Sequence, residues 1–157
     1  MRFDPYDQNF VDAVRAGGPD ANGQPAEHAV SDGAGNPCRS CLRDIARGEA
    51  MLVLAARPFP VPQPYAETGP IFLHAETCTP WRGDGLPPVL ETSPDCLVKG
   101  YGVDDRIRYG TGAIVPRDRV ATEVAARLAR DDVAYVDLRS ARNNCFLTRV
   151  RDAADIG

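Results

Sequence analysis

Lysine and histidine are scarce in this sequence. Among 157 residues there is one lysine, Lys99, and there are two histidines, so arginine supplies nearly all of the positive charge. With 18 Lys+Arg against 22 Asp+Glu, the formal net charge is −4. A chain with this balance has no basic field that would attract a phosphate backbone or an anionic lipid surface. We therefore expect neither a nucleic-acid partner nor a membrane partner.

Long hydrophobic runs are also missing. The longest apolar run, residues 51–56, is far too short to cross a bilayer, which takes about 20 apolar residues. The start of the chain carries acids and has no apolar signal region. The five cysteines are odd in number, and their spacing is not that of a disulfide framework. These features predict a cytoplasmic protein with reduced thiols.

The overall composition is that of an ordinary globular protein. Hydrophobic residues make up 43% and charged residues 25% of the chain. This length is enough to bury one core, so we predict a single domain over residues 1–157. Within it, residues 1–36 should form a short helix and an irregular arm that drapes over the domain or is mobile. Residues 37–150 should form the core.

Two helices are predicted from capping residues and apolar spacing. Asp7 can cap a short N-terminal helix, which the Gly-Gly-Pro sequence at residues 17–19 ends. Pro116 suits the first turn of a longer helix over residues 116–130. The apolar residues of that helix recur at every fourth position: Val120, Val124 and Leu128.

Strands account for the remaining apolar segments. The first of them is continuously apolar, as a central strand covered on both faces would be. Strands are predicted over residues 51–56, 71–74, 96–101, 106–109, 113–115, 133–138 and 145–150. We therefore predict an α+β fold with a mainly antiparallel sheet, one long helix in the C-terminal half and a short N-terminal helix. Its core should include Leu52, Leu54, Phe72, Val124, Leu128, Tyr135 and Val136.

Two closely spaced pairs of metal ligands stand out. Cys38 and Cys41 form a C-x2-C pair, and His74 and Cys78 form an H-x3-C pair. Zn²⁺ takes cysteine thiolates and histidine imidazole in a tetrahedral shell, so these four residues predict a zinc site. Because all four positions would be filled by protein, such a zinc would be structural rather than hydrolytic. The alternative is a set of buried thiols and a histidine bonded to a loop carbonyl.

A second candidate site lies near the C-terminal end, in the segment between the last two predicted strands. Arg139, Arg142, Asn143 and Asn144 gather two guanidinium groups and two amides in a short loop. Arginine binds carboxylate and phosphate in bidentate fashion, so this loop could hold a small anionic ligand. The alternative is a hairpin turn whose asparagines accept a left-handed backbone and whose arginines pair with Asp104, Asp105 or Asp137.

Four segments resemble a known family. CRSCLRDIARGE, PYAETGPIFLHAETC, DDRIRYGTG and YVDLRSARNNC, in this order, are similar to a bacterial family called domain of unknown function 1203 (DUF1203). The resemblance covers about residues 20–150, nearly the whole chain. It implies no reaction, substrate or cofactor.

Two functions remain open on the sequence. The first is a non-enzymatic small domain with a structural zinc site, which binds an anionic ligand or a partner. The second is an enzyme acting on a small anionic substrate at the loop from Arg139 to Cys145. A catalytic cysteine needs a base, typically histidine, and only His28 and His74 are available. A deep pocket at that loop, with a residue able to take a proton, would distinguish the two.

Overall fold

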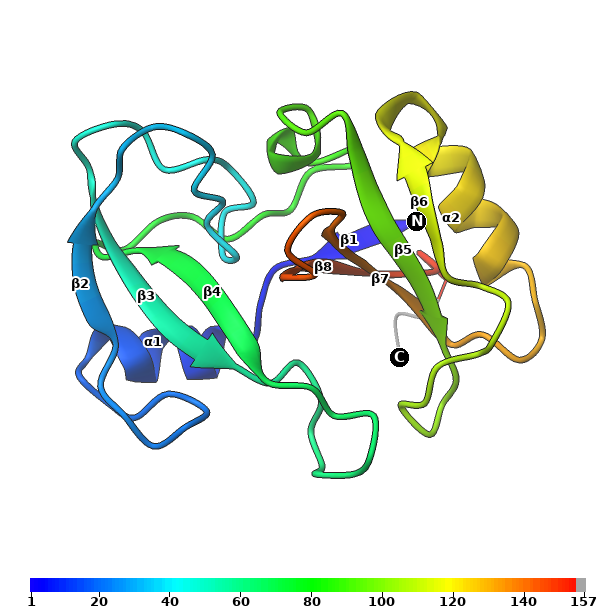
Figure 1. Cartoon of the computed structure of the whole chain (residues 1–157), viewed down its shortest axis with the longest axis horizontal. Coiled ribbons are helices and arrows are strands. Elements are labelled where there is room, and N and C mark those ends of the chain that lie inside the picture. The colour runs from blue at the N-terminus through cyan, green and yellow to red at the C-terminus, as the bar shows by residue number, and fades with distance from the viewer. Residues whose placement is uncertain (155–157) are drawn as a thin grey trace.

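The computed structural model describes residues 1–154. Within these residues the chain forms strands, two α-helices and two short 3-10 helices (Figure 1). The elements are, in chain order, β1 Arg2–Asp4, α1 Gln8–Arg15, β2 Glu27–Val30, β3 Ala50–Ala56, β4 Gly69–His74, η1 Pro88–Leu90, β5 Asp95–Tyr101, β6 Ala113–Pro116, η2 Arg117–Arg119, α2 Val120–Leu128, β7 Tyr135–Ser140 and β8 Phe146–Arg151.

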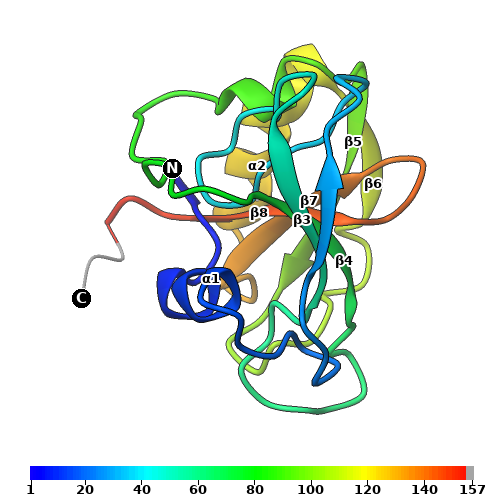
Figure 2. The same cartoon turned by 90° about the vertical axis from the view of Figure 1, so that its left-hand side faces the viewer.

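The strands form two antiparallel sheets. The larger sheet has five strands in the order β1-β8-β7-β5-β6, and the smaller has three in the order β2-β3-β4. In Figure 1 the smaller sheet and α1 occupy one end of the molecule, and the larger sheet and α2 the other. Figure 2, which faces the smaller sheet, shows α1 to one side of it. The predicted α+β class with mostly antiparallel strands is confirmed, although the strands divide between two sheets.

The N-terminal helix begins and ends as its residues predict. The carboxylate of Asp7 accepts hydrogen bonds from the backbone N–H groups of Asn9 at 2.9 Å and Phe10 at 3.4 Å. After Arg15 the chain leaves the helix, and Gly17 adopts a φ of 92°, which glycine takes without strain. Val11 and Val14 are the buried residues of this helix, so it rests on the core of the smaller sheet.

Three local predictions are corrected by the structure. Part of the segment expected to be irregular, Glu27–Val30, is β2, whose backbone pairs with β3. Residues 106–109 are not a strand, because Asp105 turns the chain at a φ of 59° and only Ile107 bridges to Tyr101. Pro116 ends β6, and the helix begins three residues after the 3-10 turn starts, at Val120.

Two apolar clusters stabilise the two halves. One lies between α2 and the larger sheet, and includes Val124 and Val136; the other lies between α1 and the smaller sheet, and includes Leu52 and Leu54. These four side chains and that of Tyr135 are buried, as expected. Two predicted core residues are only half-buried: Phe72 and Leu128. Phe72 is only half-buried because strand side chains alternate, so its neighbours Ile71 and Leu73 face the core instead.

The face of the larger sheet that points away from α2 is charged. Asp137 is fully buried there and receives two hydrogen bonds from Arg149, at 2.7 and 2.9 Å. The guanidinium of Arg149 also lies 3.8 Å from the centre of the Tyr135 ring. This face is covered by the loop between β3 and β4, through Phe59. Buried charges therefore lie close to the loop from Arg139 to Cys145.

No helix among residues 1–154 has the length and apolar character needed to cross a membrane.

Candidate metal centre and arginine cavity

The first ligand pair lies in a tight knuckle beside β4. The backbone N–H of Cys38 donates to the Arg43 carbonyl at 2.9 Å, and that of Leu42 donates to the Cys38 carbonyl at 3.0 Å. Leu42 takes a left-handed φ of 53°, which folds the segment back on itself. Cys38 also bridges to Phe72, so the knuckle is aligned with the strand that carries the second pair. His74 is the last residue of that strand, and Cys78 follows in the next loop.

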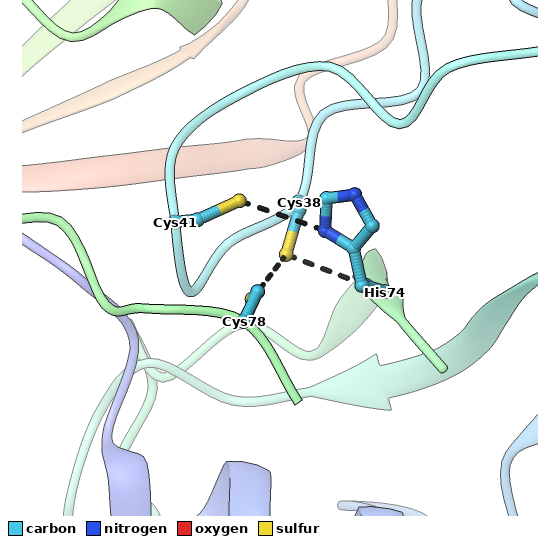
Figure 3. A group of neighbouring side chains, drawn as sticks. All are labelled: Cys38, Cys41, His74 and Cys78. Atoms are coloured by element: carbon cyan, nitrogen blue, oxygen red, sulfur yellow. Dashed lines mark hydrogen bonds between the residues drawn. The ribbon is translucent and has the colours of Figure 1, made fainter. Parts of the chain in front are cut away.

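The four predicted ligands meet at one point. The ligand atoms of Cys38, Cys41, His74 and Cys78 all lie within 4.8 Å of one another (Figure 3). Cys38 Sγ lies 3.8 Å from Cys78 Sγ, and Cys41 Sγ lies 3.5 Å from His74 Nδ1. A tetrahedron with Zn–S bonds of about 2.3 Å and a Zn–N bond of about 2.05 Å has edges of about 3.8 Å between sulfurs and about 3.6 Å between sulfur and nitrogen. The donor set and both distances fit a four-coordinate metal ion.

Two further residues hold the ligands in place. Glu49 Oε2 lies 3.3 Å from His74 Nε2, which leaves Nδ1 for the metal. From α1, Arg15 donates through Nη2 to Cys78 Sγ at 3.2 Å and through Nε to the His74 carbonyl at 3.1 Å. Three thiolates around a divalent ion would leave one net negative charge, which the guanidinium of Arg15 would offset. No spacing pattern in the sequence pointed to Glu49 or Arg15, because neither belongs to a ligand motif.

The thiols of the cluster do not titrate alike. Hydrogen bonds from Cys38 and Cys41, and then from Arg15, lower the pKa of Cys78. Hydrogen bonds to Cys38 and Cys78, together with burial, raise the pKa of Cys41. In the absence of a metal the cluster therefore favours one thiolate that shares the protons of its neighbours. A metal ion replaces those protons, since cysteine binds metals as the thiolate.

The two arginines of the second candidate site lie in different surroundings. Arg139 lies in β7 with 4% of its side chain exposed, and its Nη1 pairs with Glu67 Oε2 at 3.0 Å. Arg142 lies in the turn after β7 with 65% of its side chain exposed, and pairs with Asp95 at 3.0 Å. The two guanidinium groups therefore do not converge on one ligand. Their carboxylate partners also differ from the aspartates expected from the sequence, since Asp137 pairs with Arg149.

The asparagines shape the turn between β7 and β8. Asn144 has a left-handed φ of 58°, and its N–H donates to the Ser140 carbonyl at 2.9 Å. The N–H of Asn143 donates to Ser140 Oγ at 3.2 Å. These are the contacts of a structural hairpin turn. The hairpin alternative accounts for much of this loop.

A small cavity remains beside Arg139, and we call it the arginine cavity. Its volume is about 200 Å³, and the polar residues of its wall include Glu67, Arg139, Asn143, Asn144 and Cys145. Nε and Nη2 of Arg139 are buried and have no hydrogen-bond partner among the described residues. The hydroxyl of Tyr101 is also buried without a hydrogen-bond partner. Burial raises the pKa of Tyr101 to about 12, and the neighbouring guanidinium of Arg139 acts in the opposite direction. A hydrogen bond from Arg139 to the Tyr101 hydroxyl would satisfy one of the two nitrogens and leave the other without a partner.

Glu67 is the residue of this cavity that the sequence did not indicate. It comes from the proline-rich connection between β3 and β4, and it lies 3.8 Å from Lys99 Nζ as well as 3.0 Å from Arg139. Its carboxylate is 43% exposed, whereas Lys99 and Arg139 are largely covered. The fold therefore places two cationic side chains, Lys99 and Arg139, beside the Glu67 carboxylate at the edge of the cavity.

Comparison with known proteins gives a family and no function. A family model described as "Protein of unknown function (DUF1203)" matches residues 35–152. That span includes all four residues of the Cys3His cluster and the whole arginine cavity. No curated protein and no solved structure matches the chain.

Proposed function

We propose that this chain, which belongs to the DUF1203 family, is a non-enzymatic domain with a structural zinc site that binds a small anionic ligand. The observation that carries the metal part is the Cys3His cluster, with all four ligand atoms within 4.8 Å. Three thiolates and one imidazole are the donors of many structural zinc sites, and the distances from Cys38 Sγ to Cys78 Sγ and from Cys41 Sγ to His74 Nδ1 match the edges of their tetrahedron.

Burial supports a structural rather than a catalytic role for the metal. Cys38 is 0% and Cys41 6% exposed, and both belong to the apolar cluster beneath α1. Four protein ligands leave no position for a water molecule or a substrate. The metal would join the knuckle, the end of β4 and the following loop, and Arg15 would tie α1 to the same point. Because its ligands must stay reduced, we also propose that the protein works in a reducing compartment such as the cytoplasm.

Elemental analysis tests the metal. Protein purified under reducing, chelator-free conditions should carry about one equivalent of zinc. Cys78→Ser should lose it, whereas Cys145→Ser should keep it, because both cysteines are half-exposed but only Cys78 belongs to the cluster. Substitution by Co²⁺ should give the visible absorption of a tetrahedral thiolate site. Metal-free wild-type protein, or a Cys78→Ser variant with unchanged metal content, would disprove the proposal.

The anion part of the proposal rests on the Arg139 guanidinium. A charged group buried with unpaired N–H donors is costly, and an anion in the arginine cavity that Arg139 lines would offset the buried positive charge. Arg139, Asn143 and Asn144 would contribute to this site, whereas Arg142 lies outside it and pairs with Asp95. About 200 Å³ is room for a phosphate, a sulfate or a short carboxylate.

The Glu67→Gln variant tests anion binding sharply. Glu67 competes with any external anion for Arg139, and its own side chain is 43% exposed, so the variant should fold. Phosphate, sulfate and acetate should raise the melting temperature of Glu67→Gln more than that of the wild type. Glu91→Gln removes a negative charge at an exposed residue outside the cavity and should respond like the wild type. Equal responses in all three proteins would contradict the anion site.

The enzyme alternative has a weaker basis. Neither histidine lines the arginine cavity, since His28 is in β2 and His74 belongs to the metal cluster. Among the residues that line the cavity, Glu67 is the only side chain with the chemistry of a general base, and it is engaged by Arg139 and Lys99. A binding role therefore fits the cavity better than acid–base catalysis.

A further inference from the structure

Cys145 differs from the other cysteines in its surroundings. Cys38, Cys41 and Cys78 belong to the metal cluster, and Cys96 is 2% exposed in the core of the larger sheet. Cys145 is half-exposed and lies outside both, so it is the thiol left open to reagents when the metal site is filled. Its Sγ makes one weak contact, 3.7 Å from the Asn143 carbonyl.

The thiol lies between two buried guanidinium groups. On one side it lines the arginine cavity together with Arg139, which is 3% exposed and has two nitrogens without partners. On the other side it lines a second cavity of about 180 Å³ together with Arg39, which is also 3% exposed. Arg39 is held by carbonyls, donating to Phe146 at 2.7 Å and to Pro37 at 2.6 Å, and lacks a carboxylate partner among the described residues.

This arrangement combines a nucleophile with a receptor for negative charge. A cavity whose wall carries buried positive charge raises the local concentration of small anions. A carboxylate bound by the free N–H groups of Arg139 would lie in the same small cavity as Cys145. A thiol-reactive group attached to that carboxylate by a short chain would therefore be held close to the sulfur.

We propose that Cys145 is a site of thiol–disulfide exchange with small, carboxylate-bearing disulfides, which the arginine cavity selects by their charge. This inference rests on the anion site proposed above. The Cys145 thiolate attacks one sulfur of the disulfide, a mixed disulfide forms with Sγ, and the sulfur–sulfur bond of the reagent breaks. The departing half leaves as a thiolate and takes up the proton that Cys145 has lost, so no further oxidant is needed.

The test compares two small disulfides of opposite charge on the zinc-loaded protein. Dithiodipropionate carries two carboxylates, and cystamine carries two ammonium groups. Each rate of Cys145 modification, followed by peptide mass spectrometry, is divided by the rate of the same reagent with mercaptoethanol. We expect the normalised rate to be about tenfold higher for dithiodipropionate. A ratio near one, or first modification at another cysteine, would overturn the proposal.

Variants distinguish selection by the arginine cavity from an effect of the overall charge of the protein. Glu67→Gln should raise the preference for dithiodipropionate, because it frees Arg139 from its internal carboxylate. Arg139→Gln should abolish the preference, and Arg142→Gln should leave it unchanged, since Arg142 lies outside the cavity. If Arg139→Gln fails to fold, Glu67→Gln still decides, because an unchanged preference in that variant contradicts the proposed selection.

A Cys145→Ser variant distinguishes the two proposals. If acetate and phosphate stabilise Cys145→Ser but the wild-type thiol shows no preference for the anionic disulfide, the exchange site is wrong and the anion site stands. If no anion stabilises either protein and no preference appears, both are wrong. Stabilisation by anions together with a selective thiol in the wild type supports both.

Discussion

The carboxylate of Glu49 lies 3.3 Å from Nε2 of His74, on the side of the imidazole that faces away from the cysteines. Nδ1 of the same ring lies 3.5 Å from Cys41 Sγ. Nε2 therefore faces a carboxylate, and Nδ1 faces the Cys3His cluster. This division selects the tautomer that can bind a metal through Nδ1.

Loss of the Glu49 carboxylate should weaken metal binding. We expect Glu49→Gln to lower the affinity for zinc by about 10- to 100-fold, as loss of such an outer partner typically does. Glu76→Gln is the matched control, because Glu76 is exposed in the loop between His74 and Cys78 and forms no ion pair with the described residues. Competition with a chromophoric chelator measures both affinities. Equal affinities would show that Glu49 does not orient the histidine.

Removal of the metal should destabilise the smaller sheet and α1. When free zinc is about 100 times its Kd, the bound ion contributes about 2.7 kcal/mol to the free energy of unfolding. A chelator should remove this contribution and lower the melting temperature, and added zinc should restore it. The Cys78→Ser variant, which lacks one ligand, should show no response to the chelator. A wild-type melting temperature that ignores the chelator would contradict a structural metal.

Replacing two leucines on opposite sides of the same core by alanine should lower the free energy of unfolding by different amounts. Leu138 is fully buried in β7, whereas Leu128 is half-buried at the end of α2. We expect Leu138→Ala to lower the free energy of unfolding by about 3–5 kcal/mol, because the buried site leaves a cavity. Leu128→Ala should cost about 1–2 kcal/mol, since less of its surface leaves water. Denaturant unfolding measures both, and equal costs would mean that the packing of α2 is assigned wrongly.

The buried pair of Asp137 and Arg149 should be sensitive to neutralisation. Asp137 is 0% and the Arg149 side chain 11% exposed, so Asp137→Asn leaves a covered cation without its partner. We expect a loss of about 3–5 kcal/mol in the free energy of unfolding. Asp132→Asn breaks a bidentate contact with Arg130 at the surface and should change stability little. A small effect of Asp137→Asn would show that water reaches Arg149.

Local sequence was sufficient wherever the interaction itself is local. Asp7 caps α1 because the backbone N–H groups that donate to its carboxylate lie two and three residues away. The metal cluster was predictable because each close pair brings two donors to one turn, so only the meeting of the two pairs depended on the fold. The strand at residues 27–30 was missed because an edge strand needs backbone partners more than apolar side chains.

Interactions between distant segments were beyond the sequence. Arginines at residues 139 and 142 look equivalent in the chain, yet one is buried beside Glu67 and the other is exposed beside Asp95. The end of β7 at Ser140 decides this difference, since Arg139 is in the strand and Arg142 is in the turn that follows. No spacing rule connects Glu67 to Arg139 or Glu49 to His74, because any of the 22 acidic residues could have occupied those positions.

The sequence by itself determined the α+β class, the capped N-terminal helix and the identity of the four residues of the Cys3His cluster. These follow from periodicity, capping and donor spacing, which act over a few residues. Only the tertiary structure decided that the strands form two sheets, that Glu49 and Arg15 support the metal cluster, and that Arg139 keeps unpaired donors beside Cys145. The physical reason is that burial and charge pairing depend on which segments come into contact, and those contacts are determined by the packing of the whole chain.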